Sequence, residues 1–205
     1  MRIVGRVMLL SLLALQGCKV AGAIAYKVAG EPAVPAQYVP LAEPMLVLVE
    51  NYRNPGEAYL SSERFTQHLI KQLNDHKIAP LVDQDEYYKL RDNKTSQLSK
   101  MSVAAIGKAV GAKQVLYVDL LSSSVNLATG SDAYKGQLAA RVKVIDVETG
   151  TTRWPENAAD GYPVSLETPV IRQREGITSD TVLDMTYRSA ADQVTKLFYT
   201  WKPDE

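Results

Sequence analysis

The chain is poor in the residue types on which many functional sites depend, and it has no excess charge. Cys18 is the only cysteine in 205 residues, so no disulfide can form within the chain. Its two histidines, His68 and His76, can build a zinc site only if carboxylates from elsewhere complete it. Basic and acidic side chains balance at 23 each, which excludes the concentrated positive surface that nucleic acid requires.

Recognisable catalytic motifs are also missing. The sequence has no Gly-x-Ser-x-Gly, and its serines have no nearby histidine with an orienting acid. The glycines of Gly107–Gly111 lack the Gly-Lys-Ser/Thr ending of a phosphate loop, and close helix–sheet packing explains them better. The acidic group Asp83–Glu86 lacks the glycine and distal glutamate of an EF-hand, so it predicts a charged helix start. We expect a protein that is not an enzyme and uses no metal or cofactor.

The N-terminus has the pattern of an exported bacterial lipoprotein. Arg2 and Arg6 precede a short apolar run over 7–15, which is far shorter than the about 20 residues of a membrane span. Leu15-Gln16-Gly17-Cys18 resembles the lipobox, in which the cysteine is lipidated and becomes the mature N-terminus. We expect a signal peptide over 1–17, cleavage between Gly17 and Cys18, and attachment to the membrane through acyl chains such as palmitate on Cys18.

The rest of the chain divides into a tether and one domain. Residues 18–44 are rich in alanine and in closely spaced prolines, which favour extended backbone, so we expect a tether after the lipidated cysteine. Residues 45–205 suffice for a single α/β envelope domain. Lys19 permits delivery to the outer membrane by analogy with well-studied bacteria, so the expected location is the cell envelope, at that membrane and facing the periplasm.

Strand and helix signals alternate along the domain. Met45–Val49 predicts a strand buried on both faces, and Val115–Leu121 a strand at the sheet centre. The alternation over 138–144 and the turn Glu148-Thr149-Gly150 predict a hairpin that returns through 151–154. The other expected elements are helices over 60–75, 83–90 and 102–110, an edge strand over 78–82 and a strand over 162–166.

The last helix has the clearest pattern. Its apolar residues recur every three or four positions and lie on one stripe, which favours packing on the sheet. They are Leu183, Tyr187, Ala190, Val194, Leu197 and Trp201. The predicted fold class is α+β, a mixed β-sheet packed against helices.

Three segments of the sequence resemble those of a known family. They are Leu46–Tyr52, Ile106–Leu116 and Ala140–Gly150. With the order of strands and helices, they resemble the envelope domain shared by the TolB amino-terminal region, LpoB-type lipoproteins and CsgG-type curli secretion lipoproteins. The resemblance covers roughly Pro44 to Trp201. It implies a mixed sheet backed by helices that makes protein–protein contacts in the envelope without a catalytic centre.

One type of protein in that group forms a pore from paired hairpins. The comparable insertion here, Ser122–Gly136, is too short and too polar for two membrane-spanning strands, so a lone hairpin is expected. Our main hypothesis is a non-catalytic, lipid-anchored protein whose periplasmic domain binds an envelope protein or supports an assembly. The alternative is a subunit of an oligomeric secretion or transport ring, and homo-oligomerisation stays open.

Aromatic and arginine residues indicate where a partner would bind. The chain has eleven tyrosines and two phenylalanines, and tyrosine combines apolar area with a polar tip that suits interfaces. We expect a binding surface around 154–176 and the Tyr87-Tyr88 segment. Its candidate residues are Tyr87, Tyr88, Trp154, Tyr162, Arg172 and Arg174. The competing interpretation is that these aromatic residues anchor loops to the domain.

Overall fold

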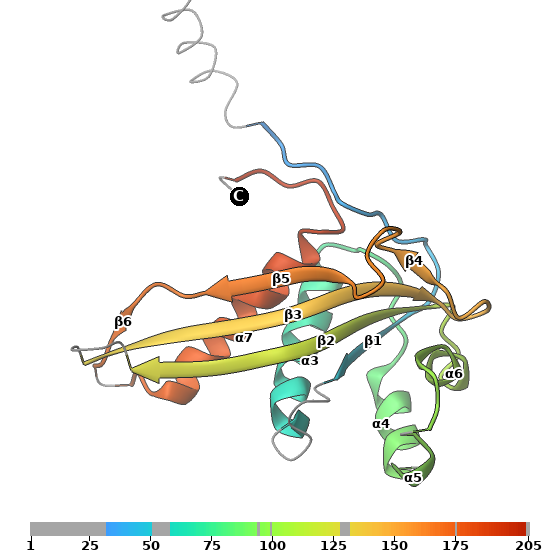
Figure 1. Cartoon of the computed structure of the whole chain (residues 1–205), viewed down its shortest axis with the longest axis horizontal. Helices are drawn as coiled ribbons and strands as arrows, with labels where there is room; N and C mark the ends of the chain where they lie inside the picture. The colour runs from blue at the N-terminus through green and yellow to red at the C-terminus, as the bar shows by residue number, and fades with distance from the viewer. Residues whose placement is uncertain are drawn as a thin grey trace, which may run out of the picture. The chain divides into compact units, whose positions relative to one another are not determined.

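The structure is a computed structural model of the chain, and it describes residues 32–50, 58–93, 95–98, 100–127, 132–174 and 176–203 (Figure 1). The predicted signal peptide, Gly17 and the lipidation site Cys18 lie outside these residues. The chain divides into two units, one of 36–199 and one that includes 32–35 and 200–203. In the smaller unit, Val34 and Trp201 exchange two backbone hydrogen bonds of 2.8 and 3.0 Å.

The larger unit is built on a mixed six-stranded sheet (Figure 1). Strand β1, Met45–Glu50, pairs in parallel with β2, Gln114–Leu127, and β2 pairs antiparallel with β3, Ala133–Asp146. Three further strands pair antiparallel with β3 at successive points along it. They are β4 (Thr152–Trp154), β5 (Tyr162–Glu167) and β6 (Ile171–Arg172).

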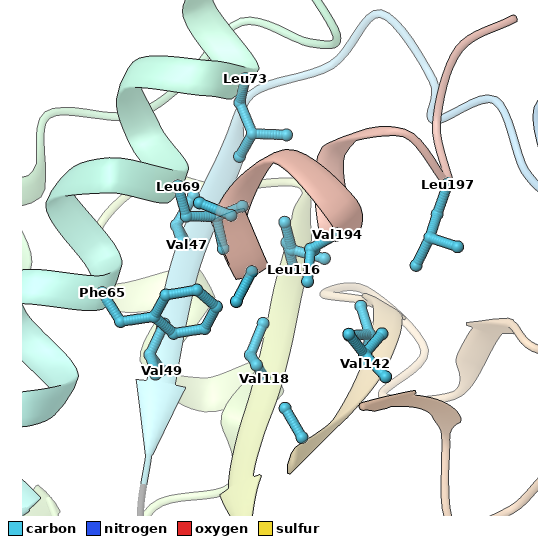
Figure 2. Packing of buried hydrophobic residues seen from close by; sticks show 14 of the residues in the cluster. Val47, Val49, Phe65, Leu69, Leu73, Leu116, Val118, Val142, Val194 and Leu197 are labelled. Carbon is cyan, nitrogen blue, oxygen red and sulfur yellow. The ribbon is translucent and has the colours of Figure 1, made fainter. Parts of the chain in front are cut away.

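Helices cover both faces of the sheet because β1 presents apolar side chains alternately to each. Val47 and Val49 face the larger core, which α3 (Ala58–Asp75) and α7 (Ser179–Thr195) close. Figure 2 shows Phe65 and Leu69 of α3 and Val194 of α7 in this core. Leu46 and Leu48 face a smaller core on the other side. The helices beside it are α4 (Gln84–Asn93), α5 (Thr95–Leu98) and α6 (Val103–Ala109).

The α+β prediction is confirmed, and so is the packing role of the helical glycine. A Cβ on Gly107 would lie 2.7 Å from the Val115 Cγ2 and 2.8 Å from the Val147 Cγ2, so α6 reaches the sheet only because this side chain is absent. Gly111, with φ of 76°, follows the helix, and because a Cβ there would meet nothing within 4 Å, this glycine serves the turn rather than the packing. Among the described residues, no helix is long and apolar enough to cross a membrane.

The prediction for the terminal helix is wrong at its end. The helix stops at Thr195, so Trp201 lies beyond it rather than on its stripe. Leu197 follows the helix and is still buried, and its carbonyl accepts hydrogen bonds from the amides of Gln37 and Tyr38. Apolar spacing continues past residue 195, but the Leu197 and Phe198 amides donate to the Val194 and Thr195 carbonyls in a tighter i→i−3 pattern, so the α-helix does not continue.

One strand prediction is also corrected. Residues 78–82 form no strand of the sheet, and only Leu81 makes an isolated bridge, to Met45. Pro80 has no N–H, and the Ile78 amide bonds back to the end of α3 at the Leu73 carbonyl. The predicted strand Val115–Leu121 does lie inside the sheet, because residues 115–119 of β2 pair with β1 on one side and with β3 on the other. The segment 122–136 is a hairpin, as expected, whose strands reach Leu127 and Ala133.

Candidate partner-binding surface

The six residues expected to bind a partner lie in three places rather than on one surface. Tyr87 and Tyr88 are on α4, where Tyr87 is 9% exposed and belongs to the smaller core. Their rings are 5.8 Å apart, and the Arg91 guanidinium carbon lies 4.7 Å from the centre of the half-buried Tyr88 ring. These contacts tie α4 to its own core, so only Tyr88 offers appreciable surface.

Trp154 and Tyr162 meet on β4 and β5 as part of an aromatic cluster, defined here as Tyr38, Trp154, Tyr162 and Phe198. The Trp154 ring stacks with Tyr38 at a centroid distance of 6.0 Å and with Tyr162 at 5.1 Å. Phe198 meets it edge-on at 5.8 Å. Trp154 itself is 8% exposed, so the half-buried tyrosines provide the accessible part of the cluster.

A shallow groove opens beside this cluster, and we call it the aromatic groove. It is lined by Gln37, Tyr38, Trp154, Pro155, Glu156, Asn157, Ala158 and Tyr162. The tyrosines supply apolar surface, whereas Glu156 and Asn157 are exposed and polar. An apolar centre beside a polar rim is the usual anatomy of a protein-binding surface.

An ion-pair network holds the chain beside this groove. Arg153 bonds to Glu43 with an Nη1–Oε2 distance of 3.1 Å and to Asp146 with an Nε–Oδ2 distance of 2.8 Å. The Thr149 backbone N–H and the Arg153 guanidinium both bond to the Asp146 carboxylate, and they lower its pKa from 3.8 to about 2. Burial raises the pKa of the Tyr38 phenol. Residues 36–44, assigned to the tether by sequence, therefore belong to the compact unit.

The two arginines lie at the other end of β3. Tyr162 pairs with Val142 of β3, whereas Ile171, next to Arg172, pairs with Tyr134. Eight strand residues separate those positions, or about 26 Å at 3.3 Å per residue. Arg172 and Arg174 are exposed but are not part of the aromatic groove.

Sequence reasoning missed the contribution of Tyr38 and Phe198 to this site. Tyr38 was placed in the tether by its proline-rich surroundings, and nothing local indicates that its ring stacks on a tryptophan 116 positions away. Phe198 lies just after the terminal helix, outside the apolar stripe. The signal that was available is that Tyr38 is an aromatic residue close to the start of the domain.

Each of the two histidines contacts a side chain from another segment. His68 Nε2 lies 2.8 Å from Asp184 Oδ1 across α3 and α7, and this hydrogen bond lowers the pKa of Asp184. The His76 ring stacks on Tyr199 at 4.2 Å. Among the residues that the structure describes, no group of three His, Cys, Asp or Glu side chains is arranged to hold a metal ion.

Comparison with known proteins finds a family at the sequence level. The model of the family described as "Peptidoglycan-synthase activator LpoB" matches residues 19–159. No curated protein matches the sequence.

Similar solved structures include several bacterial lipoproteins. Lipoprotein GNA1162 from Neisseria meningitidis is 13% identical, with 74% of this chain and 96% of that chain covered and a TM-score of 0.43. The PelC dodecamer from Paraburkholderia phytofirmans is 15% identical, with 82% and 92% covered and a TM-score of 0.40. A minor lipoprotein from Acinetobacter baumannii is 9% identical, with 76% and 91% covered and a TM-score of 0.39.

Proposed function

Because the chain belongs to the peptidoglycan-synthase activator LpoB family, we propose that it binds a peptidoglycan synthase in the periplasm and raises the activity of that enzyme. The chain itself catalyses no reaction in this proposal. The family match carries the proposal, since it spans more than half of the chain. The alternative of a secretion or transport ring gains no support from this match.

The membrane anchor completes the proposed arrangement. In this proposal, the signal is cleaved before Cys18, and acyl chains on the Cys18 thiol attach the chain to the outer membrane. The alanine- and proline-rich sequence after Cys18 is the tether that lets the domain reach the synthase. Cys18→Ala is expected to abolish incorporation of labelled palmitate and to block signal processing. A Cys18→Ala variant that still incorporates the label contradicts the anchor, whatever the domain binds.

We place the synthase contact at the aromatic groove. Tyrosine and tryptophan are enriched among the residues that dominate binding energy, and half-buried rings with restricted rotamers lose little entropy on binding. The Tyr38 and Tyr162 rings are each held against Trp154, and exposed Glu156 supplies a charged rim. Except for Tyr162, the groove residues fall within the matched range 19–159.

The test is glycan-strand polymerisation by the purified synthase of the same bacterium, with and without the mature chain. Wild-type chain is expected to raise the rate. Tyr162→Ala, which removes one half-buried ring, and Glu156→Lys, which reverses an exposed rim charge, are expected to weaken this effect about tenfold or more. Arg172→Ala is the matched control, because it changes an exposed residue that pairs with Ala133, nine residues or about 30 Å along β3 from the partner of Tyr162.

The outcomes separate the function from its location. No stimulation by wild-type chain refutes the proposed function. Stimulation that survives both groove substitutions refutes the groove and leaves the function standing. Thermal unfolding of each variant is measured alongside, and Glu156→Lys is informative even where Tyr162→Ala destabilises the cluster, because Glu156 is exposed.

A further inference from the structure

In the part of the chain that the structure describes, no strand covers the outer edge of β2 over its second half. Strand β1 pairs with β2 only from Gln114 to Asp119, whereas β3 follows β2 on its other side as far as Leu127. Among the described residues, no strand pairs with the edge from Leu120 to Leu127 that faces away from β3 (Figure 1). Alternate backbone N–H and C=O groups of this stretch therefore point away from the sheet.

Two other edges of the sheet carry features that hinder the addition of a strand. The outer side of β1 is covered, because the Met45 amide donates to the Pro80 carbonyl and the Gln84 side chain donates to the Val47 carbonyl. On the opposite side of the sheet, β5 carries Pro163, whose nitrogen has no hydrogen to offer a further strand.

The open edge also lacks the side chains that normally protect one. Lysine and other charged residues on an edge strand hinder pairing with a second chain, and proline does so because it has no backbone N–H. From 120 to 131 the sequence is Leu-Leu-Ser-Ser-Ser-Val-Asn-Leu-Ala-Thr-Gly-Ser, with no charged residue and no proline. The one irregularity is a bulge between Leu120 and Ser122, at the start of the open stretch.

The two faces of this edge are distinct, which limits what can be added to it. The Ser123 hydroxyl lies 3.1 Å from the Tyr187 hydroxyl, so Ser123 points to the face that α7 covers. Ser124 points to the opposite face, as does Asn126, whose Nδ2 donates to the Ser124 Oγ at 3.3 Å. An added strand must present small or uncharged side chains on both faces.

A second copy of the same edge meets these requirements. Two identical strands can pair antiparallel about a two-fold axis perpendicular to the sheet. With this symmetry, the face that α7 covers lies on the same side of the joined sheet in both copies. In the register that centres the pair on Ser124, this residue of one copy opposes Ser124 of the other. Since the edge is uncharged, the approach of two copies brings no like charges together within the strand pair.

We propose that the open edge of β2, residues 120–127, pairs with the same edge of a second copy and makes a two-fold symmetric dimer with one continuous sheet. The contact is isologous, so pairing closes both open edges at once and does not propagate into a ring or filament. Its area is that of one strand edge, which places it among small, transient interfaces with micromolar dissociation constants. Dimerisation of this kind is independent of the proposed activation of a synthase.

The test is sedimentation of the full mature chain carrying Cys18→Ser, which removes the lipid site and the only cysteine. The parent chain is expected to form a reversible dimer as its concentration approaches about 100 μM. Ser124→Lys and Ser124→Glu are each expected to weaken dimerisation about tenfold, because like charges then oppose each other across the pair. Mixing the two variants is expected to restore the dimer.

The matched control is Ser165 of β5, an exposed serine away from the β2 edge. Ser165→Lys and Ser165→Glu are expected to dimerise like the parent. As a second readout, Ser124→Cys is expected to form a disulfide-linked dimer under mild oxidation, and Ser165→Cys is not. A parent chain that stays monomeric at about 100 μM overturns the proposal. So does a Ser124→Lys chain that dimerises normally, or an assembly larger than a dimer.

Discussion

Gly136 marks the point at which β3 and α7 approach each other too closely for any side chain. A Cβ built on this residue would lie 2.0 Å from the Thr186 Oγ1 and 3.3 Å from the Thr168 Cγ2. The backbone of Gly136 cannot move away easily, because its amide donates to the Thr168 hydroxyl at 2.9 Å and its carbonyl accepts from the Thr168 amide. Gly136→Ala therefore forces either the strand or α7 to shift.

The expected cost follows from the surroundings of Thr186. Overpacking of a core by one methyl group costs about 1–3 kcal/mol. Thr186 is fully buried, and its hydroxyl donates to the Val182 carbonyl at 2.7 Å, so rotating it away adds the loss of a hydrogen bond, about 1 kcal/mol. We expect Gly136→Ala to lower the free energy of unfolding by about 2–4 kcal/mol.

A double-mutant cycle measured by urea unfolding tests the cause. Thr186→Ala removes the clashing oxygen and by itself costs about 1 kcal/mol, through the lost hydrogen bond. The double variant is expected to be at least about 1 kcal/mol more stable than the sum of the single effects predicts. Effects that add within about 0.5 kcal/mol would refute the reasoning, because the loss would then not arise from contact between these two residues.

Three further predictions concern other contacts. The Asp146 carboxyl has a pKa of about 2 when folded and 3.8 as its ordinary value, so its contribution to stability is present above about pH 4 and is lost as the pH falls towards 2. In the Asp146→Asn variant, the urea concentration at the midpoint of unfolding should depend less on pH across that range than in wild type. An unchanged pH dependence contradicts the assigned cause. Leu197→Asp places a carboxylate in the larger core and should cost several kcal/mol, whereas a variant that melts like wild type would mean that Leu197 faces solvent. Gly107→Ala should cost about 1–3 kcal/mol, and combining it with Val115→Ala should recover part of the loss, because the Val115 Cγ2 is one of the two atoms in the way.

Local sequence was sufficient wherever an element is defined by its own side-chain pattern. The run Met45–Val49 is apolar at every position, and it forms a strand that is buried on both faces. The turn before Gly150 needs a positive φ, which glycine adopts, and the observed value is 72°. The N-terminal lipoprotein pattern also depends on local sequence, since a peptidase and an acyltransferase read such a signal as linear sequence, and it stays a prediction.

The candidate site was only partly predictable. Trp154 and Tyr162 were identified as aromatic residues near segment ends, and they do meet in the aromatic cluster. Arg172 was grouped with them because it is near in sequence, but the chain from β5 to β6 runs along β3 and carries it to the far end. Proximity in sequence fails here because an extended strand moves about 3.3 Å per residue.

What the sequence determined by itself is therefore the composition of the elements, the predicted export signal and the absence of familiar catalytic motifs, because each depends on residues close together in the chain. Tertiary structure alone decided which aromatic rings stack, because Tyr38, Trp154 and Phe198 come from three distant segments. It also decided that, among the described residues, no strand pairs with the outer edge of β2 in its second half. That depends on where β1 ends beside it, and a strand cannot indicate in its own sequence whether a neighbour will be present.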